Sequence, residues 1–325
     1  MSETSSRTRS RSVIYVAGRQ TLIGAAIVRQ LEHQGYANII GAAGDGPNLT
    51  DGKAVTDFFA RQRPEYVFMA AGRSGGILAN QKYPADLMLD NLLAECNVVH
   101  AAYRHRVKKL LYLASSCSYP KNCPQPMRVE SLLTGPLEPT NEAYAVAKIA
   151  GIKLCQAYRQ QYGANFVIGI PANAFGPGDD FSPEDSHVIA ALIRKMHEAK
   201  LSDAPSVEVW GTGAPRREFI YADDLADACL FIMRNYDGAE PINLGGGIDT
   251  SIGELAQRVK EVVGYEGELR FDRSRPDGMP LKALDSSVLI AMGWKPTTPF
   301  RVALTATWEA FLRTQQALAN ARPNL

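Results

Sequence analysis

The sequence lacks paired cysteine motifs, long apolar runs and an excess of charge of either sign. Its five cysteines include no repeated CxxC pair, which argues against a disulfide framework or a zinc site and is typical of a reducing compartment. No stretch approaches the roughly 18 apolar residues of a membrane span. Lys and Arg number 35 against 34 Asp and Glu, which argues against a dedicated nucleic-acid-binding protein. We therefore expect a cytoplasmic protein with no metal, membrane or nucleic-acid partner.

The composition that remains is that of an ordinary globular chain. Its 325 residues are 46% hydrophobic and 21% charged, and a chain of this length buries enough surface to need no cross-link. Residues 1–12 are rich in Ser and Arg and contain no apolar stretch, so we expect a disordered tail rather than a secretory signal.

Short apolar runs alternate with helical patterns from residue 13 to residue 171. The runs predict buried strands over 13–17, 38–41, 66–70, 109–114 and 166–170. Apolar spacing predicts helices over 22–34, 53–63, 84–106 and 142–162. Such alternation is typical of βαβ units, so we predict an α/β fold with a doubly wound, Rossmann-type parallel sheet that forms a dinucleotide-binding domain over 13–171.

The pattern is less regular from residue 172 onward. Helices are predicted over 187–199, 222–235, 252–263 and 302–318, with short strands at 207–210 and 241–244. We predict a smaller C-terminal α/β substrate lobe over 172–325, some of whose segments can return to the sheet. A cleft between the lobe and the sheet is the expected binding site.

A nucleotide-binding turn is predicted between the first strand and the first helix. Gly18 would make the tight turn, and Gly24 would let helix and sheet pack closely. Thr21 stands where a further glycine usually lets backbone approach a phosphate, and it either caps the helix or offers its hydroxyl to the phosphate. The helix N-terminus would face a pyrophosphate. The predicted cofactor-binding residues are Gly18, Arg19, Thr21, Leu22, Ile23, Gly24 and Ala71, with Tyr144 and Lys148.

The choice between NAD and NADP stays open at this stage. The segment 40–45 holds, at the tip of the second strand, neither the acidic residue that bonds a ribose 2′-hydroxyl nor the arginine that meets a 2′-phosphate. Arg19 is available for NADP, and Asp45 is available for NAD.

A second motif carries the candidate catalytic groups. Tyr144 and Lys148 lie four residues apart, on one face of a predicted helix. A lysine ammonium favours tyrosinate, which would make the phenol a proton donor and acceptor near neutral pH. Ser115 follows the fourth strand directly, at the edge of the sheet where ligands bind, and can hold a carbonyl oxygen that gains negative charge.

These motifs resemble the extended short-chain dehydrogenase/reductases, and several segments resemble the GDP-L-fucose synthases among them. The matching segments are 75–80 (GGILAN), 114–120 (ASSCSYP), 137–151, 186–189 (SHVI), 209–219 and 276–278 (PDG). The resemblance implies an NAD(P)-dependent epimerase/reductase that acts on a GDP-linked 4-keto-6-deoxyhexose. A 4-ketone acidifies the protons on C3 and C5, so inverting these centres needs a base and an acid near the ring.

The resemblance also implies a role for each of five residues. Cys117 would be the base and His187 the acid of the epimerisation. Tyr144 would protonate the C4 oxygen while hydride passes from the nicotinamide to C4. Lys148 would tune Tyr144 and bond the nicotinamide ribose, and Ser115 would hold the C4 oxygen.

The C-terminal part supplies the expected substrate contacts. Arg217 suits a diphosphate, because its guanidinium bonds two phosphate oxygens at once. Trp210 would cover the nucleotide or sugar, or lie in the core. Lys195 stands where the resemblance leads us to expect arginine. The predicted substrate-binding residues are Asn173, Val188, Lys195, Trp210, Arg217 and Lys282. The family also implies a homodimer through helices 84–106 and 142–162.

Departures from the family pattern lie in the cofactor half. The family has Gly at the position of Thr21 and Arg at those of Gln20 and Ala42. The chain therefore uses NADPH through other groups, uses NADH, or is a relative with a changed reaction. The alternatives are an epimerase without reductase activity, a reductase of another nucleotide keto-sugar such as a colitose-type dideoxy sugar, and a non-catalytic nucleotide-binding scaffold.

Overall fold

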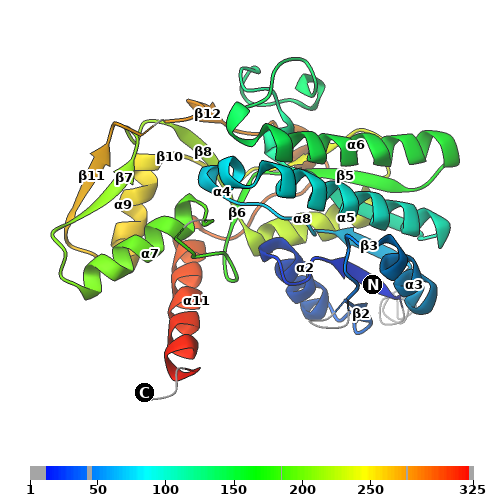
Figure 1. Ribbon diagram of the computed structural model, residues 1–325, viewed down its shortest axis with the longest axis horizontal. Helices are drawn as coiled ribbons and strands as arrows, with labels where there is room; N and C mark the ends of the chain where they lie inside the picture. Colours follow the sequence, from blue (N-terminus) through cyan, green and yellow to red (C-terminus); the bar gives the residue numbers. More distant parts are fainter. Residues whose placement is uncertain (1–11, 42–45, 184, 276, 322–325) are drawn as a thin grey trace.

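The centre of the molecule is a six-stranded parallel sheet (Figure 1). The computed structural model describes residues 12–41, 46–183, 185–275 and 277–321. The strands are β2 (Ile39–Ile40), β1 (Ile14–Ala17), β3 (Tyr66–Met69), β4 (Lys109–Leu113), β5 (Phe166–Pro171) and β9 (Ile242–Leu244), in this spatial order. The chain reverses direction across the sheet between β1 and β3, and ligands bind at the carboxyl ends of strands beside such a point.

Two layers of helices cover this sheet (Figure 1). In one layer, α5 (Pro84–Arg104) packs against α6 (Glu142–Tyr162) and α3 (Gly52–Gln62). In the other layer, α2 (Leu22–His33) packs against α8 (Ala222–Asn235). β1 and β5 are buried along their whole length, which explains why both are apolar without interruption. The predicted doubly wound sheet is thus confirmed.

A smaller group of elements lies at the left of Figure 1. Its central strand is β8 (Arg216–Tyr221), which pairs with β6 (Asn173–Phe175), β10 (Ile248–Ser251) and β12 (Leu281–Lys282). β7 (Ser206–Trp210) and β11 (Glu268–Asp272) form a separate pair. The helices of this group are α7 (Val188–Leu201), α9 (Ile252–Val263) and α11 (Phe300–Ala321). Their apolar side chains gather in a second hydrophobic core.

Part of the chain beyond residue 171 belongs to the first core instead. β9 pairs with β5, and α10 (Ser287–Ala291) contacts β9. Side chains of α8, β9 and α10 join the core of the parallel sheet. Segments therefore do return to the sheet, while the domain boundary at residue 171 stays a prediction.

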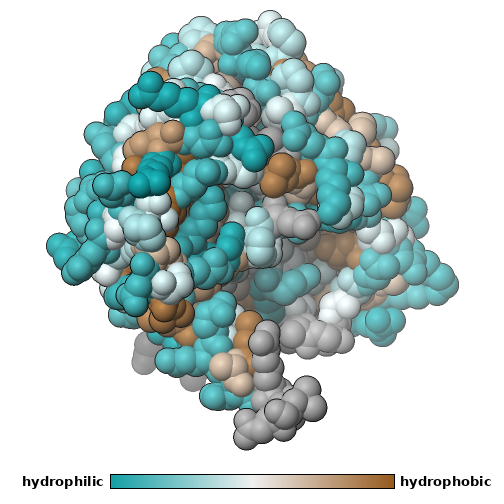
Figure 2. Space-filling model, turned by 60° about the vertical axis from the view of Figure 1, so that its left-hand side comes forward, coloured by the Kyte–Doolittle hydropathy of each residue, from teal (hydrophilic) through white to brown (hydrophobic). Residues whose placement is uncertain are grey.

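Several elements and positions complete this description. α4 (Ile77–Lys82) and three short 3-10 helices, at Ser116–Ser118, Val129–Ser131 and Pro139–Asn141, lie in the connections. Residues 1–11 of the expected tail, Ala42 and Asp45 lie outside the described residues. No helix within the described ranges is long and apolar enough to cross a membrane. The face shown in Figure 2 is largely hydrophilic, with hydrophobic side chains in small separate groups.

Candidate active site

The turn after β1 is shaped by two close backbone contacts. Gly18 has a φ of +85°, and a Cβ there would lie 2.5 Å from the Cα of Ala71, which follows β3. A Cβ on Gly24 would lie 2.0 Å from the Gly18 carbonyl oxygen. Both positions therefore require glycine, as the nucleotide-binding pattern predicts.

Thr21 is the N-cap residue of α2. Its hydroxyl accepts from the Gly24 N–H at 3.1 Å and donates to the Gly18 carbonyl at 2.8 Å. Of the two roles considered for Thr21, the structure thus shows the cap. Leu22 and Ile23 are the first two residues of the helix, so their N–H groups have no partner within it. These N–H groups and the positive end of the helix dipole form a site for a phosphate.

Arg19 is the cation nearest to this turn by sequence. Its guanidinium lies 3.9 Å from the Glu32 carboxylate, a loose pair of partly exposed side chains. A ligand with more negative charge can displace such a contact, because exposed ion pairs contribute little free energy. Gln20 is exposed beside it.

Ser115 follows β4 and caps the 3-10 helix Ser116–Ser118. Its Oγ accepts from the Cys117 N–H at 3.2 Å. The Ser115 hydroxyl also lies near the side chains of Cys117 and Tyr144, and it lowers the pKa of each. Ser115 therefore joins two acid–base groups at the carboxyl edge of the sheet.

Tyr144 and Lys148 project from the same face of α6. The Lys148 Nζ lies 5.9 Å from the centre of the Tyr144 ring and 2.9 Å from a carboxylate oxygen of Glu95 on α5. Burial raises the pKa of Tyr144, and Lys148 opposes this effect without overcoming it. Lys148 thus favours tyrosinate, as the sequence predicts, although the pKa of the phenol stays above its ordinary value. Burial outweighs the ammonium, so Tyr144 is a protonated donor.

Cys117 has two cationic or polar donors on its sulfur. The Asn141 Nδ2 lies 3.2 Å and the Lys282 Nζ 3.3 Å from its Sγ. Burial alone would raise the pKa of the thiol, but the charge of Lys282 and the hydrogen bonds from Ser115, Lys282 and Asn141 lower the pKa overall. Cys117 is therefore a thiol biased toward thiolate, the form that accepts protons.

β12 brings Lys282 to this thiol from the far end of the chain. It pairs with β8, where Lys282 lies opposite Arg217. Glu218, the next residue on β8, accepts from the backbone N–H of Leu284 at 2.7 Å and of Gly246 at 2.6 Å. This buried carboxylate thus ties the segment after Lys282 to β8.

His187 stands at the N-terminus of α7, directly before Val188. Its side chain reaches the surface, yet the surrounding chain desolvates the ring. This desolvation lowers the pKa of His187, the charge of Lys282 lowers it further, and Asp180 raises it. The charge of Lys282 therefore lowers the pKa of both Cys117 and His187, the predicted base and acid.

Two of the predicted substrate contacts, Trp210 and Lys195, lie beside each other. Trp210 is 41% exposed, which excludes the core alternative for this residue. Lys195 lies 5.4 Å and Arg275 4.8 Å from the centre of its ring. Arg217 uses one nitrogen on the backbone, donating to the Arg216 carbonyl at 2.7 Å. Asn173 donates to the Glu218 carbonyl at 2.8 Å, so its amide nitrogen supports the pairing of β6 with β8.

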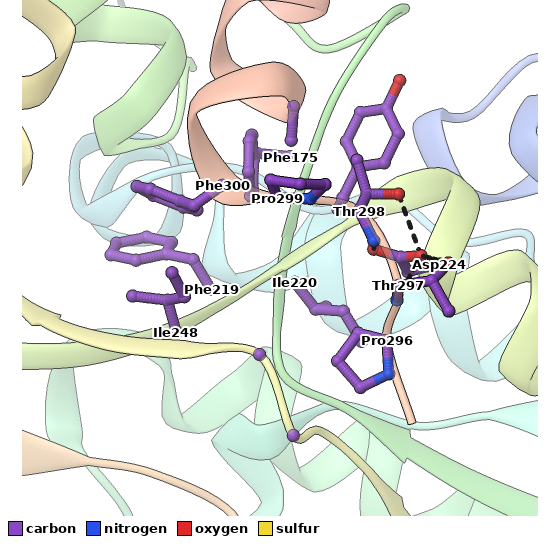
Figure 3. A pocket seen from close by; sticks show the side chains of 14 residues that line it. Phe175, Phe219, Ile220, Asp224, Ile248, Pro296, Thr297, Thr298, Pro299 and Phe300 are labelled. Carbon is purple, nitrogen blue, oxygen red and sulfur yellow. Dashed lines mark hydrogen bonds between the residues drawn. The ribbon is translucent and has the colours of Figure 1, made fainter. Parts of the chain in front are cut away.

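A cavity of about 290 Å³ lies apart from these groups (Figure 3). It is lined by residues of β6, β8, loop 246–247 and the start of α11, and no predicted site residue is among them. Asp224 at its wall accepts from the hydroxyl of Thr298 at 3.0 Å. The one carboxylate of this cavity is thus already hydrogen-bonded, and none of the predicted catalytic groups lines it.

Sequence reasoning missed Glu95, Asn141 and Arg275. Glu95 resembles any polar residue of a helix, although Gly151 inside α6 marks the place where it packs. Asn141 directly precedes the helix of Tyr144, which is the only local signal for it. Within the described ranges, no group of His, Cys, Asp and Glu is arranged to hold a metal ion.

Comparisons with known proteins show the family of this chain. Residues 14–245 match the model of the NAD dependent epimerase/dehydratase family. The chain is 51% identical over 312 residues to GDP-L-fucose synthase 1 of Arabidopsis thaliana, covering 96% of this chain and 97% of that one. It is 46% identical over 315 residues to GDP-L-fucose synthase of Escherichia coli, covering 94% and 98%.

A solved structure adds the fold and a cofactor. The GDP-L-fucose synthetase of Naegleria fowleri bound to NADP superposes with a TM-score of 0.87 at 29% identity, over 94% of this chain and 96% of that one. The chain thus belongs to the NAD dependent epimerase/dehydratase family and, within it, to the group of the GDP-L-fucose synthases.

Proposed function

We propose that the protein epimerises C3 and C5 and reduces C4 of a GDP-4-keto-6-deoxyhexose, forming GDP-L-fucose or a close analogue. The observation that carries the proposal is the position of Ser115, whose hydroxyl accepts from the Cys117 N–H and lowers the pKa of both the Cys117 thiol and the Tyr144 phenol. A thiol suited to remove a proton and a phenol suited to give one therefore face the same substrate atoms. A carbonyl oxygen held by Ser115 would lie between them.

Cys117 acts as the base of the epimerisation. The 4-ketone acidifies the hydrogens on C3 and C5, and the Cys117 thiolate takes one of them to leave an enolate. Ser115 donates a hydrogen bond to the enolate oxygen, which stabilises its charge. Protonated His187 returns a proton on the opposite face, which inverts the centre. Before the second centre is inverted, Cys117 releases its proton to water and His187 takes one up from water.

Tyr144 acts in the reduction. A bound nicotinamide cofactor would supply the hydride that C4 receives. Tyr144 gives its phenolic proton to the oxygen on C4, and the nearby ammonium of Lys148 stabilises the tyrosinate that results. The raised pKa of Tyr144 suits this role, because the phenol is protonated before the step.

The residues at the sheet edge fit such a cofactor. A Cβ on Gly18 would collide with the backbone of Ala71, and a Cβ on Gly24 would collide with the Gly18 carbonyl, so the turn can only be this tight with glycine. The N–H groups of Leu22 and Ile23 suit the pyrophosphate. We further propose NADPH as the reduced cofactor, with Arg19 released from Glu32 to meet the 2′-phosphate. A lower NADPH affinity in Arg19→Met, with NADH affinity unchanged, would support this assignment. Equal losses for the two cofactors would contradict it.

The GDP part of the substrate is proposed to lie on the smaller lobe. Trp210 offers an exposed ring for a base or sugar, and Arg217, Lys195 and Arg275 supply positive charge for the diphosphate. Asn173 and Val188 are the further substrate contacts that the sequence predicts.

The proposed assembly is a homodimer through α5 and α6. Leu87 and Val98 on α5 are buried in the monomer, so neither is available to a partner. Leu89 and Leu93 on α5 are 56% and 38% exposed, four residues apart on one face. Leu93→Glu should convert the dimer to a monomer, as measured by light scattering. A monomeric wild type would exclude the proposed dimer. We propose a cytoplasmic location because the five cysteines are free.

The test supplies GDP-4-keto-6-deoxymannose with NADPH or NADH in deuterated water. The proposal expects deuterium at C3 and C5 and oxidation of the reduced cofactor. Exchange without cofactor oxidation would select an epimerase alone. If neither deuterium exchange nor cofactor oxidation occurs, the proposal is overturned and a binding protein is favoured.

A further inference from the structure

Lys148 forms a buried ion pair that the proposed reaction does not use directly. Its Nζ lies 2.9 Å from the Glu95 Oε1, and the two side chains are 4% and 2% exposed. Nζ also donates to the Leu113 carbonyl at 3.4 Å. An ammonium has three donors, so one N–H of Lys148 is left for a ligand.

The packing of α5 on α6 makes room for this pair. A Cβ on Gly151, three residues after Lys148, would lie 2.7 Å from the Glu95 Oε2 and 2.3 Å from the Tyr112 hydroxyl oxygen. Glycine weakens a helix interior, so its presence here is explained by the carboxylate and phenol that fill the gap. The fold therefore brings Glu95 to Lys148 at a site of close helix contact.

The other titratable groups around the pair are neutral. Burial and the charge of Glu95 raise the pKa of Tyr112 and of Cys155, so neither supplies a counter-charge. Burial keeps Tyr144 protonated. The sulfur of Cys117 contacts Lys282 and Asn141 instead. Glu95 is thus the carboxylate that balances Lys148 in the described part of this core.

We propose that Glu95 is a positioning residue that keeps Lys148 charged and holds its Nζ beside Tyr144. Burial opposes a charge on Lys148, and the Glu95 carboxylate more than offsets this effect, so that the pKa of Lys148 is raised. The same carboxylate raises the pKa of Tyr144. The inference rests on the proposed reduction, because it assigns Glu95 to that half of the reaction.

The consequence concerns the alkaline limit of the reduction. Without the negative charge of Glu95, the pKa of Lys148 and that of Tyr144 both fall. Each of the two changes lowers the pH at which the reduction fails, because the step needs a charged Lys148 and a protonated Tyr144. The rate of reduction should then decline at a lower pH than in the wild type.

The test compares pH profiles of single-turnover reduction in wild type, Glu95→Gln, Glu95→Asp and Tyr112→Phe. We expect the alkaline limb of Glu95→Gln to move down by about one pH unit or more, and Glu95→Asp to recover part of this displacement. Tyr112→Phe removes a neutral hydroxyl that contacts the Lys148 carbonyl and Glu95 but leaves the carboxylate charge in place, so its limb should move far less than that of Glu95→Gln. An unchanged limb in folded Glu95→Gln overturns the inference.

A second measurement does not depend on turnover. The ultraviolet absorbance of tyrosinate, taken as the difference between each protein and its Tyr144→Phe counterpart, reports the ionisation of Tyr144 alone. It should appear at lower pH in Glu95→Gln, and identical titrations would contradict the proposal. The wild type could lack reductase activity while the titration of Tyr144 in Glu95→Gln still lies at lower pH than in the wild type. This pair of results would overturn the proposed function and leave the role of Glu95 intact.

Discussion

Two lysines of the site act on their neighbours in opposite settings. Lys148 is buried and paired with the Glu95 carboxylate, and the pKa of adjacent Tyr144 remains above its ordinary value. Lys282 has its Nζ on the Cys117 sulfur, and its charge lowers the pKa of this thiol. No carboxylate within 4 Å of Lys282 is present in the described ranges.

The difference lies in the balance between burial and the lysine charge. Burial outweighs Lys148 at Tyr144, whereas the charge of Lys282 and the hydrogen bonds to the sulfur outweigh burial at Cys117. Glu95 adds to the effect of burial and so helps to keep Tyr144 a proton donor for reduction. Lys282 helps to prepare Cys117 as a proton acceptor for epimerisation. One site can thus hold both a donor and an acceptor next to the same serine.

The largest expected effect comes from removing the donor. Tyr144→Phe should reduce cofactor oxidation by about 10²- to 10⁴-fold, because a positioned general acid contributes that much. Deuterium exchange at C3 and C5 should continue, since Cys117 is untouched. Paired measurement of NADPH absorbance and of deuterium by mass spectrometry checks this separation. Loss of both activities in a folded variant would contradict the assignment of Tyr144 to reduction alone.

The next effect concerns the acceptor. Lys282→Met removes the charge that lowers the pKa of Cys117, so this pKa should rise. The thiolate is the form needed, so the acid limb of the exchange rate should move to higher pH, and the rate at neutral pH should fall about tenfold for each pH unit that the limb moves. Lys153→Met, an exposed lysine on α6 bonded to Gln156, is the control and should leave the limb unmoved. An exchange profile of Lys282→Met that coincides with the wild type would contradict the role of Lys282.

The smallest effect tests the gap that admits the counter-ion. Gly151→Ala should destabilise the fold by about 1–3 kcal/mol through overpacking, less the roughly 1 kcal/mol that alanine gains in a helix. Urea unfolding measures this difference. Gly253→Ala on α9 is a matched control, since its Cβ would approach nothing nearer than 3.4 Å. Equal stability of the two variants would show that Gly151 is not needed to seat Glu95.

Local patterns predicted the parallel sheet and most of its helices. The predicted helix 142–162 matches α6 at both ends, because its apolar spacing is regular and Gly163 ends it with a φ of +66°. β12 is two residues long and exists through its pairing with β8, so no local pattern marks it. Lys282 and Cys117 stand 165 residues apart, and their contact depends on that pairing. The chemistry of the thiol was therefore beyond sequence reasoning, although both residues were named.

The most direct test of the account follows both halves of the reaction in one sample. Wild-type protein, GDP-4-keto-6-deoxymannose and NADPH are combined in deuterated water, and isotope content and cofactor oxidation are followed together. The account predicts deuterium at C3 and C5 of a reduced product, with exchange lost selectively in Cys117→Ala and reduction lost selectively in Tyr144→Phe. Reduction without any exchange in the wild type would contradict it.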